Sequence, residues 1–144
     1  MFISKLLIAL LIVVALLLLL ALLGRKSVHH EVSIQASPEQ VWTTIFQTSE
    51  YDNWNPVMKL LEGEVQEGNQ VTYQFTQDAE KSYPIPTKVK QIIPNQLLHQ
   101  GGGMVGVLTF NHQYRLEATE DYTRLIIHED YRGIGIHFWN PTKV

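Results

Sequence analysis

The chain has 144 residues, a length that suits a single domain. Lys5, Arg25 and Lys26 are three of its 11 basic residues, so residues 27–144 carry eight basic against 14 acidic residues, a net charge of −6. An acidic domain with scattered lysines has no basic stripe for nucleic acid, and no nucleic-acid partner is expected.

The first element is an apolar run. Every residue from Leu6 to Leu23 is Leu, Ile, Val or Ala. Such a helix would be about 27 Å long, close to the roughly 30 Å hydrocarbon core of a bilayer. A cleaved secretory signal is the alternative, but the run is longer than a usual signal core and no A-x-A site precedes Gly24. Residues 1–26 are therefore predicted to be a transmembrane anchor with a basic flank.

The charges beside this run bear on its orientation. Lys5 precedes it, whereas Arg25 and Lys26 follow it. The excess of one positive charge favours a single-pass protein whose domain lies on the cytoplasmic side, and it leaves the extracytoplasmic orientation open. The chain contains no cysteine, so disulfides give no clue to the compartment.

A domain over residues 27–144 follows without a linker. Residues 29–36 alternate between polar and apolar, which predicts a half-buried strand. Ser37, Pro38 and Gln40 form a capping box with proline at the first helical position, which predicts a helix over 37–46. A short helical segment should follow and end at the Trp-Asn-Pro of residues 54–56, because Pro56 favours an extended chain.

The rest of the chain has the pattern of antiparallel strands. Gly101, Gly102 and Gly103 are expected to turn the chain as a flexible hairpin or a pocket lid. Six or seven strands together with these helices predict an α+β domain. The expected strands lie in residues 57–65, 62–77, 86–93, 95–100, 106–118 and 123–133.

The last two strands also predict their register. If residues 119–122 form a loop, Leu116 faces Leu125 and His112 faces Glu129 on the apolar face. On the other face Glu117 meets Arg124, which is an opposite-charge pair. Apolar residues then face apolar ones and charge faces charge, as a correct register requires.

These segments resemble the SRPBCC superfamily, also called START-like or polyketide cyclase–dehydrase and lipid-transport proteins. The resemblance covers residues 28–139 and rests on A-S-P-E-Q-V-W at 36–42, W-N-P at 54–56, and the spacing of T-R-L at 123–125 with Glu129 and Gly133. It implies a helix-grip fold, in which a bent antiparallel sheet wraps around a long C-terminal helix and encloses an apolar cavity. Members bind lipids, sterols, polyketides or other hydrophobic molecules, and some are cyclases or chaperone activators.

The expected site is a cavity that holds a hydrophobic small molecule or lipid, with no cofactor and no metal. The alternative is that the same side chains fill a solid core. Tyrosine hydroxyls, which need partners when buried, favour the cavity. The candidate lining residues are Tyr51, Trp54, Val71, Tyr73, Phe75, Val89, Phe110, His112, Tyr114, Ile127, Glu129 and Tyr131.

His112 and Glu129 are the polar pair on this face. They could orient a ligand hydroxyl or carbonyl, act as a general base, or be a structural pair. A cyclase or dehydratase that uses them is an alternative function, but no nucleophile–base–orienter set accompanies them. A protein-interaction module like the chaperone-activating relatives is a third possibility.

The second Trp-Asn-Pro, residues 139–141, has another context. Asn140 and Pro141 have the form of an N-cap and a first helical residue, and residues 142–144 would be an opening turn. The sequence thus predicts a domain truncated at its long C-terminal helix, with an open apolar groove. Residues 27–144 alone are expected to aggregate, bind a hydrophobic dye or dimerise.

Overall fold

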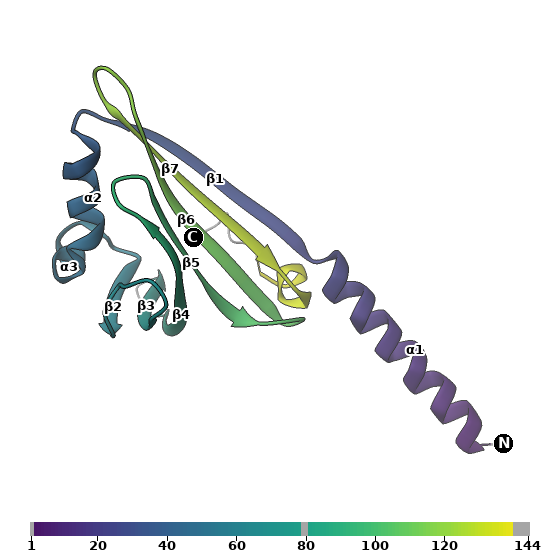
Figure 1. The fold of residues 1–144 in the computed structure, drawn as a ribbon. Helices are drawn as coiled ribbons and strands as arrows, with labels where there is room; N and C mark the ends of the chain where they lie inside the picture. Colours follow the sequence, from purple (N-terminus) through teal and green to yellow (C-terminus); the bar gives the residue numbers. More distant parts are fainter. Residues whose placement is uncertain (1, 79–80, 140–144) are drawn as a thin grey trace.

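The computed structural model describes residues 2–78 and 81–139, which form an α+β fold (Figure 1). Seven strands make one antiparallel sheet in the order β1-β7-β6-β5-β4-β3-β2. The short helices lie at one end of the curved sheet, and α1 extends from the other. The elements are α1 (Phe2–Leu23), β1 (Arg25–Ile34), α2 (Pro38–Phe46), the 3-10 turn η1 (Thr48–Glu50), α3 (Tyr51–Trp54), β2 (Met58–Glu62), β3 (Gln70–Asp78), β4 (Lys81–Ile93), β5 (Leu97–Met104), β6 (Leu108–Ala118), β7 (Thr123–Arg132) and the 3-10 turn η2 (Ile134–His137).

Helix α1 is long and apolar enough to cross a membrane. The segment Ser4–Leu23 has a mean hydropathy of 3.6, and none of it is buried in the protein. A membrane anchor and a secretory signal share this length and composition. Strand β1 begins at Arg25, four residues before the predicted strand, because it pairs with β7 from Arg25 opposite Arg132 to Ile34 opposite Thr123.

The predicted capping box of α2 is confirmed. The Ser37 hydroxyl accepts a hydrogen bond from the Gln40 backbone N–H at 3.4 Å, and the Gln40 side chain accepts one from the Ser37 N–H at 3.0 Å. Helix α3 ends at Trp54, where the Asn55 side chain accepts hydrogen bonds from the N–H groups of residues 57 and 58. The first Trp-Asn-Pro therefore ends a helix and starts β2.

The predicted register of β6 and β7 is also confirmed. Leu116 lies opposite Leu125, and His112 lies opposite Glu129. On the other face the Arg124 guanidinium donates to the Glu117 carboxylate. The register fixes which residues of these strands face the concave side of the sheet.

The predicted turn at the three glycines is wrong. Residues 101–103 belong to β5, and the chain turns at residues 104–107, where the Val107 N–H donates to the Met104 carbonyl. The neighbouring strands approach too closely for side chains here. A Cβ on Gly101 would lie 2.6 Å from the Phe110 carbonyl oxygen, and one on Gly102 would lie 2.5 Å from that of Pro86.

The hydrophobic core fills only one end of the concave face. Val41 and Ile45 of α2 pack there against strand residues, and the buried Tyr51 hydroxyl donates to the Ile45 carbonyl at 2.5 Å. Beyond β7 the described chain forms only the short turn η2, and the predicted helix start at Asn140 and Pro141 lies outside the described residues. The strand residues of this core are Val71, Tyr73, Val89, Leu98 and Leu116.

Candidate functional site

A cavity of about 550 Å³ lies on the concave face, with a lining that runs from the core residues Tyr51 and Tyr73 to Gly103 and Leu108 at the β5–β6 end of the sheet. Its lining is mainly aliphatic and aromatic, and it comes from α3 and from β2 to β7, with residues 57 and 139 beside them. Cavities of this size and character are typical of small-molecule sites. The lining residues are Tyr51, Val57, Met58, Tyr73, Phe75, Gln77, Tyr83, Pro84, Ile85, Pro86, Thr87, Gln100, Gly103, Leu108, Phe110, His112, Tyr114, Glu129, Tyr131 and Trp139.

Two local features make room for the cavity. Gly102 lies opposite Phe110 on β6, and a Cβ on Gly102 would come within 3.0 Å of the Phe110 ring. Because Gly102 has no side chain, the Phe110 ring packs against the β5 backbone. The pairing of β4 with β5 also stops at Thr87 opposite Gly102, so Pro84 and Pro86 pair only with β3. Proline lacks a backbone donor and is tolerated where a strand has one neighbour.

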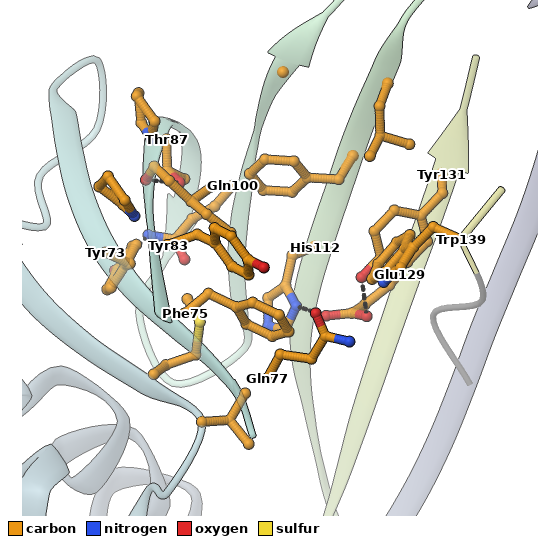
Figure 2. Close-up of a pocket in the computed structure, with 18 of the residues that line it drawn as sticks. Tyr73, Phe75, Gln77, Tyr83, Thr87, Gln100, His112, Glu129, Tyr131 and Trp139 are labelled. Atoms are coloured by element: carbon orange, nitrogen blue, oxygen red, sulfur yellow. Dashed lines mark hydrogen bonds and ion pairs between the residues drawn. The ribbon is translucent and has the colours of Figure 1, made fainter. Parts of the chain in front are cut away.

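A polar cluster of three side chains lies at one side of the cavity (Figure 2). His112 Nδ1 lies 2.5 Å from Glu129 Oε1, and the Tyr131 hydroxyl donates to Glu129 Oε2 at 2.6 Å. The side chains of His112 and Glu129 are only 19% and 25% exposed. Both oxygens of the carboxylate therefore have a partner in a half-buried, largely apolar setting. Hydrogen bonds to a charged group in such a setting are stronger than those between neutral groups.

The electrostatics of the cluster favour an ionised Glu129. Burial raises the pKa of this carboxyl, but the hydrogen bond and the charge of His112, with the Tyr131 hydrogen bond, outweigh it and leave the pKa below its ordinary value. Burial, followed by the hydrogen bond to Glu129, raises the pKa of Tyr131. Burial and the nearby carboxylate likewise raise the pKa of Tyr114. At neutral pH Glu129 is thus ionised, and the phenols of Tyr114 and Tyr131 are neutral.

A second polar pair lies across the cavity. The Gln100 amide donates to the Tyr73 hydroxyl at 2.8 Å, and both side chains are buried. Figure 2 shows Phe75 and Tyr83 between this pair and His112. Burial raises the pKa of Tyr73, which the Gln100 hydrogen bond partly offsets, so this side of the cavity is uncharged. The cavity is therefore apolar in its middle and polar at two separated places.

The structure brings most of the predicted site residues to this cavity. Two others, Trp54 and Ile127, line an adjoining hollow of about 530 Å³ beside α2, which shares His112 and Glu129 with the first. Val71 and Val89 lie instead in the core, 2% and 0% exposed, in the same buried cluster as Val41 and Ile45 of α2. The predicted residues that line the larger cavity are Tyr51, Tyr73, Phe75, Phe110, His112, Tyr114, Glu129 and Tyr131.

Sequence reasoning missed other lining residues. Tyr83 and Ile85 precede the predicted strand 86–93 because Pro84 and Pro86 hid the first half of β4, and Thr87 was inside that strand but was not assigned to the site. The alternation of Tyr83, Ile85 and Thr87 with the two prolines was the available signal. Gln100 was missed because its strand was expected to end there. Trp139 reaches the site only by packing edge-on against the Tyr131 ring, with 5.1 Å between ring centroids, which no sequence pattern indicates.

Comparisons with known proteins bear on the fold. No family model matches the chain, and no curated protein matches it in sequence. Solved structures do. SA2116 from Staphylococcus aureus, of unknown function, is 17% identical with a TM-score of 0.60 over 74% of this chain and 68% of that one. The protein named Ara h 8.0201 is 12% identical with a TM-score of 0.60 over 76% and 78%.

A third match is DynU16, from the dynemicin biosynthetic locus. It is 16% identical with a TM-score of 0.56, over 72% of this chain and 36% of that one. At such identities a structural likeness establishes the fold and leaves function open. The curved antiparallel sheet with its two short helices, following one apolar N-terminal helix, is thus an α+β helix-grip fold.

Proposed function

We propose that this chain is a membrane-anchored binding protein of the SRPBCC superfamily that holds a small, uncharged hydrophobic ligand on the concave face of its sheet. The observation that carries this proposal is the cavity of about 550 Å³, lined mainly by apolar side chains, beside the core. A solid core would have filled this space, since protein interiors are close-packed.

The polar cluster defines the chemistry of the ligand. Glu129 is ionised and offers only acceptors, so a ligand carboxylate or phosphate beside it would be repelled. A ligand hydroxyl or amide N–H could donate to the carboxylate, and the Tyr131 oxygen could accept. The ligand is therefore a lipid or lipid-like molecule with a neutral hydrogen-bonding head group and an apolar body.

The membrane anchor is part of the same proposal. The end of α1 is tied into the domain, because the Gly133 N–H donates to the Gly24 carbonyl and the His137 ring contacts the Leu20 carbonyl, each at 2.9 Å. A segment that is hydrogen-bonded to the folded domain in this way supports a retained anchor over a cleaved signal. The measured mass of the mature protein distinguishes the two.

Native mass spectrometry of the full chain extracted from membranes tests the ligand. A co-purifying neutral lipid is expected on the wild type. Val57→Trp, which adds bulk to the cavity wall, should lose it, whereas the matched control Leu61→Trp, at a 51% exposed position outside the cavity, should retain it. Wild-type protein free of lipid, or lipid that is unchanged by Val57→Trp, would contradict the proposal.

A further inference from the structure

The membrane helix is joined to the domain without a flexible linker. The Gly24 N–H donates to the Leu20 carbonyl at 2.9 Å, and β1 begins at the next residue. Gly24 also packs directly on Gly133, the residue after β7, since a Cβ on Gly24 would lie 2.0 Å from the Gly133 carbonyl oxygen. The end of the sheet next to α1 is therefore held at the place where the helix leaves the bilayer.

The β5–β6 turn lies at this same end of the sheet (Figure 1). Turn η2 connects it to the helix: the Ile134 N–H donates to the Gly106 carbonyl at 3.0 Å, and the Gly135 N–H donates to the Val107 carbonyl at 2.8 Å. The opposite end of the sheet carries α2, α3 and the β6–β7 turn. The β5–β6 turn thus faces the membrane surface, whereas the β6–β7 turn faces away from it.

Four large apolar side chains are exposed at the membrane end, and we call them the apolar rim. They are Met104, Val105 and Val107 of the turn and Phe138 after η2, exposed by 67%, 90%, 51% and 83%. Exposed apolar groups gathered in one place mark an interaction surface. Arg25 and Arg132, which pair across β1 and β7, are exposed beside them and suit lipid head groups.

We propose that the apolar rim inserts into the interface of the leaflet in which α1 ends, as a second membrane contact. The surface is continuous with the spanning helix, and apolar side chains beside basic ones are what the boundary of head groups and acyl chains accepts. The rim also borders the cavity: Gly103, Leu108 and Trp139 line the cavity and are the chain neighbours of rim residues. Resting on the proposed binding function, the rim places the cavity mouth at the lipid surface, so that a ligand enters from the bilayer.

The chain has no cysteine, so a single introduced one carries a unique probe. Val105→Cys labelled with the fluorophore NBD, in the full chain reconstituted into phosphatidylcholine vesicles, should show blue-shifted emission and strong quenching by lipids with a shallow nitroxide. The control is Glu120→Cys in the exposed β6–β7 turn, where emission should stay that of a probe in water. Equal, unquenched spectra at both positions would overturn the contact. A blue shift without quenching would mean that protein covers the rim, and would overturn it equally.

The second experiment separates this contact from ligand binding. Val105→Asp lies outside the cavity lining, so it should bind a fluorescent monoacylglycerol in detergent as the wild type does. Its uptake of the same probe from vesicles should be slower by about tenfold, the equivalent of about 1.4 kcal/mol in the transfer barrier. Equal uptake would overturn entry from the bilayer. A wild type that fails to bind in detergent, with quenching at position 105 intact, would refute the binding function and leave the membrane contact standing.

Discussion

The polar cluster makes a quantitative prediction about stability. Glu129→Gln keeps the shape of the side chain but removes the charge that receives hydrogen bonds from His112 and Tyr131, at 2.5 Å and 2.6 Å. A hydrogen bond to a charged group contributes about 1.5–3 kcal/mol, and the amide can replace part of both contacts. The expected loss is about 2 kcal/mol in the free energy of unfolding. For a domain of this size that lowers Tm by about 8 °C.

The assay is thermal unfolding of the detergent-solubilised full chain, followed by tryptophan fluorescence. The matched control is Glu31→Gln, which removes another carboxylate paired with a histidine, His29, at 2.8 Å. Both of those side chains are about half exposed, so solvent screens the pair and a much smaller shift in Tm is expected. A Glu129→Gln shift no larger than that of the control would refute the account of the cluster.

Three further predictions follow from the structure. The folded-state pKa of Glu129 lies below its ordinary value of 4.5, so the ionised carboxylate stabilises the fold above pH 4.5, and this stabilisation is lost as the pH falls below 4.5. A denaturation series from pH 7 to pH 3 should show this loss in the wild type and not in Glu129→Gln. Gly102→Ala should destabilise the domain by at least about 1 kcal/mol, since the new Cβ would lie 2.5 Å from the Pro86 carbonyl oxygen. Urea unfolding that matches the wild type would contradict the explanation that neighbouring strands leave no room for a side chain here. The bias of basic residues around α1 predicts a cytoplasmic domain, and an alkaline phosphatase fusion at the C-terminus that is active would show the opposite orientation.

Local signals predicted the parts of the fold that local physics determines. The capping box at Ser37 and Gln40 set the start of α2, because the two residues satisfy each other's backbone groups whatever lies around them. The pairing of Glu117 with Arg124 and of Leu116 with Leu125 fixed the β6–β7 register, since a shift by one residue would move every apolar side chain to the other face.

The parts that were missed depend on how strands approach one another. The glycines at 101–103 have the composition of a turn, yet they lie within β5, where the Phe110 and Pro86 carbonyl oxygens leave no room for a Cβ on Gly101 and Gly102. Alternation placed Val71 and Tyr73 on the same face, but only the packing of α2 and α3 decides that Val71 is covered while Tyr73 reaches the cavity. Tertiary packing decides which part of a sheet face is filled by side chains and which part is hollow. The period of the sequence pattern does not contain this information.

The central claim is that a neutral hydrophobic ligand binds on the concave face of the sheet. Photo-crosslinking tests it most directly, with a long-chain monoacylglycerol that carries a diazirine in its acyl chain, added to the full chain and mapped by peptide mass spectrometry. The account predicts adducts on peptides that contain Phe75, Phe110 and Tyr131, with competition by unlabelled monoacylglycerol and weak competition by the fatty acid of the same length. Adducts confined to residues 4–23 of α1, or equal competition by the fatty acid, would contradict it.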